Sequence, residues 1–426
     1  MQLSLLLPLI VSSAGLFLLL KLRFFFLLHP IRVTKSFVKE LRSGASASAF
    51  WLALAGTLGV GNIFGTAAGI MTGGAGSVFW LILSALFSGV LKYSETSLTL
   101  AMKEKNECGF QSILPKIFVR YGKFLAVVYS VLCLCLAFLM GSAIQSSAVS
   151  DILDSALHIP VEISAILLSG LIYIGVHKGA GGIERATARL VPIASVGFIS
   201  LCLFAIIKNA GNFLPAVRLI FSEAFTPAAF SGGVLGFLCS KALTEGFARG
   251  ILSNEAGIGT SAMAHSRADN RTPYVGGLFG IAEVIFDTVI LCGLTALALL
   301  CSSADPTGFS TPMAYVFSAF NTSLGMLAGP ILICSVFIFG YSTMICWYYY
   351  GSSCMGYIFG KKTNAFTPAF LVSAVCGALL GAGKLLAMTD TVIFLMALIT
   401  LSAVVKSHKR IYSLTPILSE KKSRRR

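Results

Sequence analysis

Charged side chains are scarce in this sequence. Only 12% of the residues are Asp, Glu, Lys or Arg, whereas 56% are hydrophobic and the mean hydropathy is +0.86. An average soluble domain is about 25% charged, and a soluble fold built from this composition would have too few polar residues to cover its surface. The composition therefore excludes a soluble globular protein and predicts a chain that lies mostly in lipid.

The groups that carry enzyme chemistry are also sparse. All five histidines lie near the ends of apolar segments, and the motifs HExxH, GxSxG and GxxxxGK[ST] are missing. The 11 cysteines are an odd number without zinc-type spacing, and most lie inside apolar segments, which indicates small core residues rather than a disulfide framework. We therefore expect no enzyme, no cofactor and no metal other than a transported ion.

Eleven apolar segments predict transmembrane helices, because a span needs about 20 mostly apolar residues. They are residues 3–20, 48–71, 77–102, 124–149, 161–176, 189–207, 231–265, 274–300, 327–354, 368–383 and 386–405. The first segment lacks a preceding basic region and a small-residue cleavage site, so we interpret it as a retained span and not as a signal peptide. The sequence thus predicts an all-α protein that crosses the membrane many times.

The basic residues predict the orientation in the membrane. Of the 32 Lys and Arg residues, 26 lie in alternate connections and in the C-terminal tail, while three lie on the opposite side. Cytoplasmic connections collect Lys and Arg, so we expect an outside N-terminus and a cytoplasmic C-terminus in the cell membrane. This asymmetry explains the net charge of +15 without a nucleic-acid partner.

The second apolar segment contains the glycine-rich sequence GTLGVGNIFG at residues 56–65. Four glycines in ten residues weaken a helix by about 1 kcal/mol each relative to alanine. The glycines could serve close helix packing, or they could mark an unwound segment whose free carbonyls and amides bind a cation and a carboxylate. The polar side chain of Asn62 within this segment favours the second interpretation.

The seventh segment also combines glycines with charges. Gly246 and Gly250 are expected to interrupt this helix. Lys241, Glu245 and Arg249 are spaced by four residues, which places them on one helical face. Charges at such depth are rare and usually paired, so either a structural ion pair or a gating or coupling role is open.

The two glycine-rich helices start two groups of five spans. Since five is odd, the groups have opposite topology, which is typical of inverted-repeat transporters whose site lies between broken helices. We expect an extra N-terminal helix at 1–30, a first repeat at 46–208, a second repeat at 213–406 and a basic tail at 407–426.

Five segments of this chain resemble the alanine/glycine:cation (sodium:alanine) symporter family. They are GTLGVGNIFGTAAGI (56–70), GGAGSVFWLILSALFSGVLKYSE (73–95), ARGILSNEAGIGTSAMAH (248–265), IFDTVILCGLTAL (285–297) and FGYSTMICWYYYG (339–351). The resemblance implies a leucine-transporter-like 5+5 inverted repeat, a sodium or proton gradient as the driving force, and alanine or glycine as the substrate.

The resemblance also implies roles for individual residues. Cation sites would use Asn62 with the backbone around Ala55 and Thr57, and the hydroxyls of Ser342 and Thr343. The substrate site would comprise Gly59, Val60, Gly61, Gln145, Gly246 and Trp347, with the amides near Gly59 and Gly61 holding the carboxylate. Gln145 could instead make a helix–helix hydrogen bond, and Trp347 could pack against lipid.

Two positions depart from the family pattern. Val60 replaces the threonine of the family's Gly-Thr-Gly-Asn sequence, and Gly56 stands where some members carry an acid that could pair with the substrate ammonium. We expect a symporter that imports a small neutral amino acid, alanine or glycine, with sodium by alternating access. The alternatives are proton coupling, a different selectivity, a channel, a non-transporting membrane receptor or an enzyme.

Overall fold

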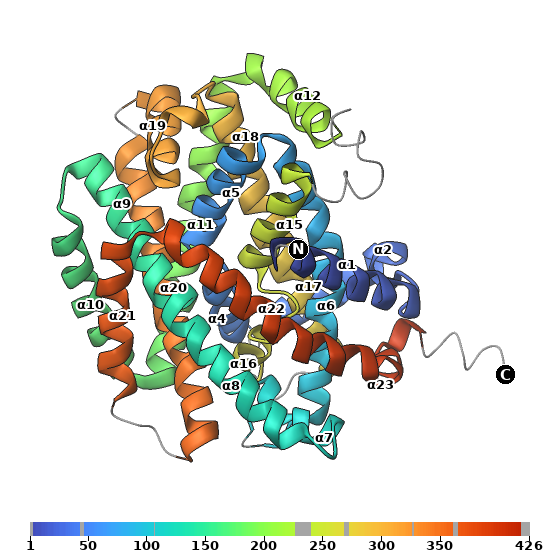
Figure 1. Ribbon diagram of the computed structural model, residues 1–426. Coiled ribbons are helices and arrows are strands. Elements are labelled where there is room, and N and C mark those ends of the chain that lie inside the picture. The colour runs from blue at the N-terminus through green and yellow to red at the C-terminus, as the bar shows by residue number, and fades with distance from the viewer. Residues whose placement is uncertain are drawn as a thin grey trace.

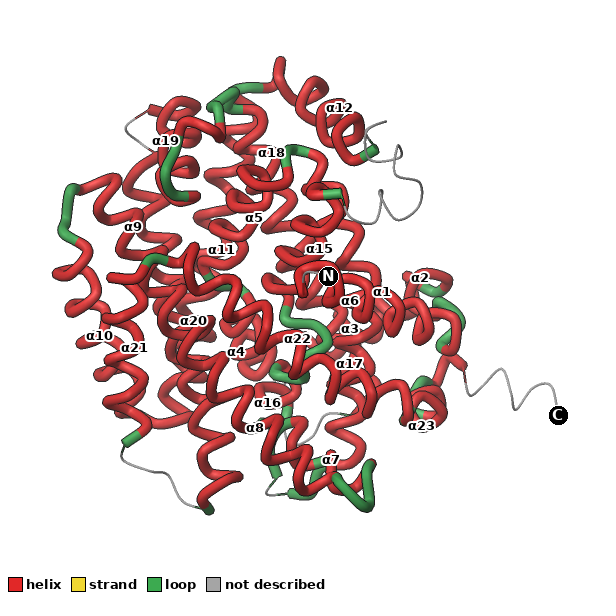
Figure 2. The backbone as a smooth tube through the Cα atoms, in the orientation of Figure 1, coloured by secondary structure: helices red, strands yellow, loops and turns green. Residues whose placement is uncertain are grey.

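The computed structural model describes residues 3–42, 47–105, 107–225, 240–267, 272–325, 328–360 and 365–418. Within these ranges every regular element is a helix, and the helices form one bundle joined by short connections (Figures 1 and 2). The all-α prediction is therefore confirmed.

The predicted spans coincide with helices of the structure. In the described part of the chain, seven helices are long and apolar enough to cross a membrane: α4–α5 (Ala47–Thr57 and Val60–Gly73), α6 (Gly76–Met102), α8–α9 (Gly122–Phe138 and Gln145–Leu157), α11 (Gly179–Lys208), α17–α18 (Pro273–Val284 and Gly293–Cys301), α20 (Ala328–Phe359) and α22 (Ala382–Lys406). Three apolar helices are shorter: α1 (Leu3–Lys21), α10 (Val161–His177) and α21 (Phe366–Leu380). The seventh predicted span contains α15 (Lys241–Asn254) and α16 (Ser261–His265), and its residues 231–239 lie outside the described part.

Two kinked spans contain π-helical segments, at Leu139–Ile144 between α8 and α9 and at Ile285–Cys292 between α17 and α18. A π-helical segment shifts the register of the side chains and is frequent at functional sites. Gln145 follows the first segment directly, and Asp287 lies inside the second.

Several short helices lie outside the predicted spans. They are α2 (Phe25–Leu28), α3 (Pro30–Arg42), α7 (Leu114–Ile117), α12 (Phe213–Ala224), α19 (Pro312–Leu324) and α23 (His408–Ser413), with short 3-10 turns at Phe110–Ser112, Ala210–Asn212 and Pro306–Gly308. Figure 1 shows α12 and α19 at the upper end of the bundle and α7 at the lower end. The connections predicted for opposite sides of the membrane thus lie at opposite ends, while the orientation itself stays a prediction.

Glycines let α15 pack closely against α6. A Cβ atom at Gly246 would collide with the backbone of Ser77, and one at Gly250 would collide with the side chain of Ser84. Both glycines lie inside the continuous helix α15, so the prediction that they interrupt it is wrong. They are small residues at a helix–helix contact, and the break comes afterwards, at residues 255–260.

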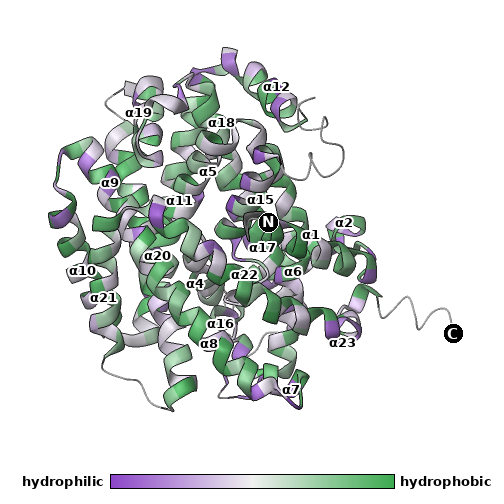
Figure 3. Ribbon diagram, in the orientation of Figure 1, coloured by the Kyte–Doolittle hydropathy of each residue, from purple (hydrophilic) through white to green (hydrophobic). Residues whose placement is uncertain are grey.

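The outer surface of the bundle is apolar. Figure 3 shows hydrophobic residues along the outward sides of the helices, and Leu167, Ile193, Val196 and Phe204 are each more than 60% exposed. Large apolar patches of this kind are rare on soluble monomers, whereas a lipid-facing surface requires them. The protein is accordingly a multi-pass membrane protein.

Candidate functional site

The first helix break lies between α4 and α5. Leu58 and Gly59 separate the two helices, and Gly59 has an extended backbone with φ −97° and ψ −172°. The amide of Val60, freed by the break, donates to Oε1 of Gln145 on α9 over 2.9 Å. The structure therefore brings together Gly59, Val60 and Gln145, three of the predicted substrate-binding residues, and Gln145 makes the interhelical bond that was its alternative interpretation.

The second helix break lies between α15 and α16. Glu255, Gly257 and Gly259 all have positive φ angles, of 55°, 87° and 74°. The amides of Gly257 and Gly259 donate to the carboxylate of Glu95 on α6, over 2.6 and 3.1 Å. Irregular backbone at membrane depth is tolerated where its polar groups are satisfied inside the protein, and Glu95 does this for the second break.

A small pocket lies between the two breaks. It is lined by Gly56, Thr57, Gly59, Gly61, Phe64, Met140, Ile144, Gln145, Leu252, Ser253 and Glu255. Its free volume is about 10 Å³, which is roughly the space of one water molecule. An amino acid could enter only after the surrounding helices move, so the structure represents a closed form of this site.

Trp347 lies behind this pocket and not on the lipid surface. Its side chain is fully buried, which excludes the interpretation as lipid-facing packing. The indole Nε1 donates to Oε1 of Glu255 over 3.1 Å, so Trp347 contacts the second break through a carboxylate. Gly246, by contrast, packs against α6 away from the pocket lining, and its contact with substrate stays a prediction.

A buried polar cluster joins α5, α15 and the π-helical segment of the α17–α18 span. Asp287 is fully buried and accepts from Asn62 Nδ2 over 2.6 Å, from Ser253 Oγ over 2.6 Å and from Thr288 Oγ1 over 2.9 Å. The hydroxyl of Ser253 also lies 3.2 Å from Oδ1 of Asn62. The cluster gathers one carboxylate and several neutral oxygens, which are the types of ligand that a hard cation prefers.

Asp287 was missed by the sequence interpretation, although the sequence carried a signal for it. It is the only acid in the apolar segment IFDTVILCGLTAL, and an ionisable residue inside a span indicates function by default. Ser253 gave no comparable signal, because serines are common in membrane helices. Only the fold places it beside Asn62.

A second group of oxygens joins α4 to α20. The hydroxyl of Thr343 lies 2.8 Å from the carbonyl oxygen of Ala55, to which it donates. The hydroxyls of Ser342 and Thr57 instead donate to carbonyls of their own helices, Phe339 at 3.0 Å and Leu54 at 3.3 Å. The structure thus unites Ala55 and Thr343 from the predicted cation residues, whereas Asn62 belongs to the Asp287 cluster.

Replacing Ser342 and Thr343 together with alanine tests this second group. We expect the sodium concentration for half-maximal uptake to rise about tenfold or more if the two hydroxyls bind the cation as predicted, because both oxygens are then lost. Sodium titrations of uptake, normalised to the amount of protein in the membrane, measure the effect. Ser335→Ala on the same helix is the matched control, since Ser335 is equally buried but lies outside both oxygen groups. Unaltered sodium dependence in the double variant would exclude these hydroxyls as ligands.

The charges of α15 form part of an ion-pair network. Arg249 lies 3.4 Å from Glu245 of its own helix and 3.4 Å from Asp390 of α22. Lys241 is exposed at the first residue of α15 and makes no ion pair within the described residues. Two of the three predicted gating or coupling residues are therefore connected, and the partner that links α15 to α22, Asp390, was not foreseen.

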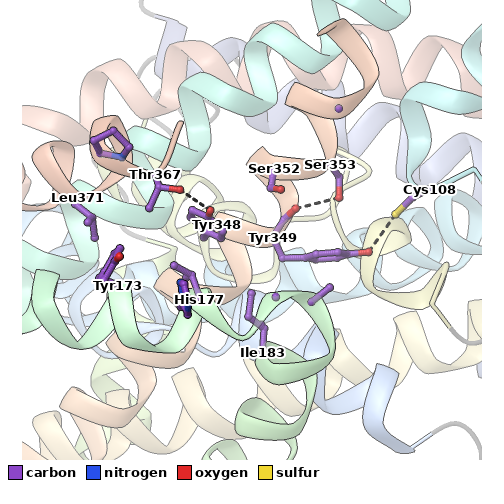
Figure 4. Close-up of a pocket in the computed structure, with 15 residues that line it drawn as sticks. Cys108, Tyr173, His177, Ile183, Tyr348, Tyr349, Ser352, Ser353, Thr367 and Leu371 are labelled. Atoms are coloured by element: carbon purple, nitrogen blue, oxygen red, sulfur yellow. Dashed lines mark hydrogen bonds between the residues drawn. The ribbon is translucent and has the colours of Figure 1, made fainter. Parts of the chain in front are cut away.

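A larger cavity, of about 760 Å³, opens between α10, α11, α20 and α21 (Figure 4). Figure 4 shows Tyr348 and Tyr349 extending from α20 in opposite directions. The hydroxyl of Tyr348 lies 2.7 Å from Oγ1 of Thr367, and that of Tyr349 lies 3.2 Å from Sγ of Cys108. The cavity lies among connections predicted to face the cytoplasm, and nothing in the linear sequence indicated it.

Comparisons with known proteins identify the family of this chain. A model of the sodium:alanine symporter family matches residues 1–425. The sodium/alanine symporter AgcS of Methanococcus maripaludis is 30% identical over 427 residues, covering 95% of this chain and 93% of that protein. An uncharacterized transporter of Haemophilus influenzae is 30% identical over 413 residues, covering 94% of this chain and 90% of that protein.

The fold is similar to that of a solved transporter. MhsT, solved in complex with L-phenylalanine, superposes with a TM-score of 0.60 at 15% identity, covering 86% of this chain and 88% of that one. Similarity at this level shows the fold alone, and it confirms the predicted leucine-transporter-like architecture. The relatives are transporters and not enzymes.

Proposed function

Because this chain belongs to the sodium:alanine symporter family, we propose that it carries alanine or glycine together with sodium across a cell membrane. The observation that carries the proposal is that two helix breaks meet at one pocket. The first break is flanked by the Ala55–Thr343 oxygens on its α4 side and by the Asp287 cluster on its α5 side. In transporters built from inverted repeats, substrate and coupling ion bind at such broken helices.

Sodium as the coupling ion is supported by the chemistry of the two oxygen groups. One contains the hydroxyl of Thr343 and the carbonyl of Ala55, and the other contains the carboxylate of Asp287 with the oxygens of Asn62 and Ser253. Hard cations prefer oxygen ligands. A negative charge in the second group also lowers the cost of bringing a cation into the membrane interior.

A small substrate is supported by the lining of the pocket. Gly56, Gly59 and Gly61 line the pocket and have no side chains, so the backbone itself forms this part of the wall. Free backbone amides at a helix break can bind a carboxylate. We propose that the amides near Gly59 and Gly61 bind the substrate carboxylate and that Gln145 moves away from the amide of Val60 to make room. Phe64 and Met140 then limit the side chain to the size of a methyl group.

Alternating access follows from the contacts on the two sides of the pocket. On the side predicted to face outward, Arg249 links α15 to α22 through Asp390. On the side predicted to face the cytoplasm, the cavity beside Tyr348 and Tyr349 offers a route of release. We propose that the bound sodium and substrate favour closure on the outer side, after which the inner contacts of the two tyrosines separate.

Uptake into proteoliposomes tests the proposed function. We expect radiolabelled alanine to accumulate against its own gradient when an inward sodium gradient is imposed, because sodium entering down its gradient would drive the entry of alanine. Excess glycine should compete, whereas leucine and phenylalanine should not, since the pocket lacks the space for their side chains. If uptake persisted when choline replaced sodium but disappeared with a protonophore, the coupling ion would be the proton and not sodium. Selective competition by a larger amino acid would overturn the substrate assignment.

A further inference from the structure

Tyr350 leaves little space for a side chain at position 56. A Cβ atom at Gly56 would lie 2.7 Å from the hydroxyl oxygen of Tyr350 and 3.2 Å from its ring. Tyr350 is fully buried within α20, so any side chain at position 56 would require it to shift. Among the residues that line the pocket, the acidic one is Glu255.

Glu255 places a carboxylate in the pocket from the opposite break. It lines the pocket together with Gly56, Gly59 and Gly61, and it is only 2% exposed. Its φ angle of 55° is unusual for a residue with a side chain, and such strained positions concentrate at functional sites.

Two neutral side chains donate hydrogen bonds to the Glu255 carboxylate. Nε1 of Trp347 donates to Oε1 over 3.1 Å, and Oγ1 of Thr260 donates to Oε2 over 2.7 Å. A carboxylate oxygen can accept more than one hydrogen bond, so both oxygens retain capacity for a further donor. The arrangement orients the carboxylate without neutralising it.

The buried acids of the described residues fall into two classes. Glu283 is paired with Lys92 at 3.0 Å and with His265, and Glu95 accepts from two backbone amides. Glu255 and Asp287, like Glu95, have no basic partner within 4.0 Å among the described residues and accept only from neutral donors. They differ from Glu95 in position, since Glu255 lines the pocket and Asp287 lies in the polar cluster, whereas Glu95 accepts from the backbone of the second break. A buried charge without a counter-charge is costly, so each of these two acids is suited to a cation that arrives from outside.

We infer that Glu255 binds the positively charged amino group of the substrate, so that the second break supplies the amine recognition. The inference rests on the proposed function and deepens it by naming the substrate class, molecules with a free α-ammonium group. The substrate then lies between the two breaks, with its carboxylate toward the amides of α5 and its ammonium toward Glu255. Asp287 remains the acid for sodium.

Glu255→Gln tests the inference in purified full-length protein. We expect sodium alone to raise the melting temperature as in the wild type, because the Asp287 cluster is unchanged. The alanine concentration needed for half of the further shift should rise about 100-fold or more, since the ammonium would be buried without its counter-charge. L-lactate, which has a hydroxyl in place of the ammonium, should show no such loss, because its weak binding does not depend on the charge.

Thr260→Val is the matched control, because it removes one hydrogen bond to Glu255 and keeps the charge. We expect it to weaken alanine binding less than tenfold. Equal losses in Thr260→Val and Glu255→Gln would show that the hydrogen-bonded framework, and not the charge, supports binding, and this would overturn the inference. Wild-type alanine affinity in Glu255→Gln would also overturn it, and so would loss of the sodium response, which would make Glu255 a sodium ligand.

The wild type and Glu255→Asp provide tests that do not depend on folding of the glutamine variant. L-lactate should compete with alanine at least 100-fold more weakly in the wild type, and Glu255→Asp should bind alanine more weakly while retaining the preference over lactate. Competition by lactate within tenfold of alanine would overturn the inference. A wild type that responds to no zwitterionic amino acid would instead refute the proposed function, so the two failures are distinguishable.

Discussion

Replacing Asp287 with asparagine is expected to abolish sodium-dependent uptake of alanine. The amide of Asn62 and the hydroxyls of Ser253 and Thr288 donate to this carboxylate. An asparagine has nearly the same shape, but it removes the negative charge that would offset the desolvation of sodium. We expect the sodium affinity to fall by about 100-fold or more, measured as the sodium-dependent shift in melting temperature and as uptake.

Cys292→Ala is the matched control for Asp287→Asn. Its sulfur lies 3.2 Å from Oγ of Ser253 and borders the same cluster, but it supplies no oxygen. We expect the sodium dependence of this variant to match that of the wild type. A well-folded Asp287→Asn protein with unchanged sodium dependence would place the coupling ion elsewhere, for example at Thr343 and Ala55 alone.

Replacing Gly61 with leucine is expected to eliminate substrate binding and to leave the fold intact. Gly61 lines the pocket, and a Cβ atom added there would have no neighbour within 4 Å. This finding does not support the alternative that Gly61 packs against a neighbouring helix. Leucine is favoured in helices and in membranes, so α5 should still form, and the side chain should occupy the space that the substrate needs when the helices move apart. Alanine should then no longer raise the melting temperature, whereas sodium still does.

Gly65→Leu separates this effect from a general effect of a larger residue in α5. Gly65 lies one turn further along the same helix, and a Cβ atom there also has no neighbour within 4 Å. Unlike Gly61, it does not line the pocket. We expect Gly65→Leu to retain the alanine-dependent shift. If Gly61→Leu retained it as well, the substrate could not lie against this part of the first break.

The first break was predictable from the sequence, and the second only in part. Gly56, Gly59 and Gly61 cluster around Asn62, and the helix does break within this cluster. In the second case Gly246 and Gly250 gave the same signal, although they serve close packing against α6. Glycine enrichment alone cannot separate these two uses, because both depend on the missing Cβ atom.

Partners that are distant in the sequence were the least predictable part of the site. Asn62 and Asp287 are 225 residues apart, and Trp347 and Glu255 are 92 residues apart. Apolar periodicity places each residue on a helix, but it does not specify which buried polar groups meet across the bundle. The short helices α3 and α19 were missed for a related reason, since hydropathy detects long apolar segments and these helices are short or amphipathic.

The interlocked surfaces of α6 have a mechanical consequence. Its neighbours α15 and α17 both contact it through glycines, Gly246 and Gly250 on one side and Gly277 and Gly280 on the other. Surfaces that fit so closely resist sliding, and the buried bond between Lys92 and Glu283 fastens α6 to α17 further. We therefore expect α6, α15 and α17 to move together as one rigid body. The bending that such a motion requires then falls on the two stretches of irregular backbone, so the residues proposed to bind the substrate would also act as hinges.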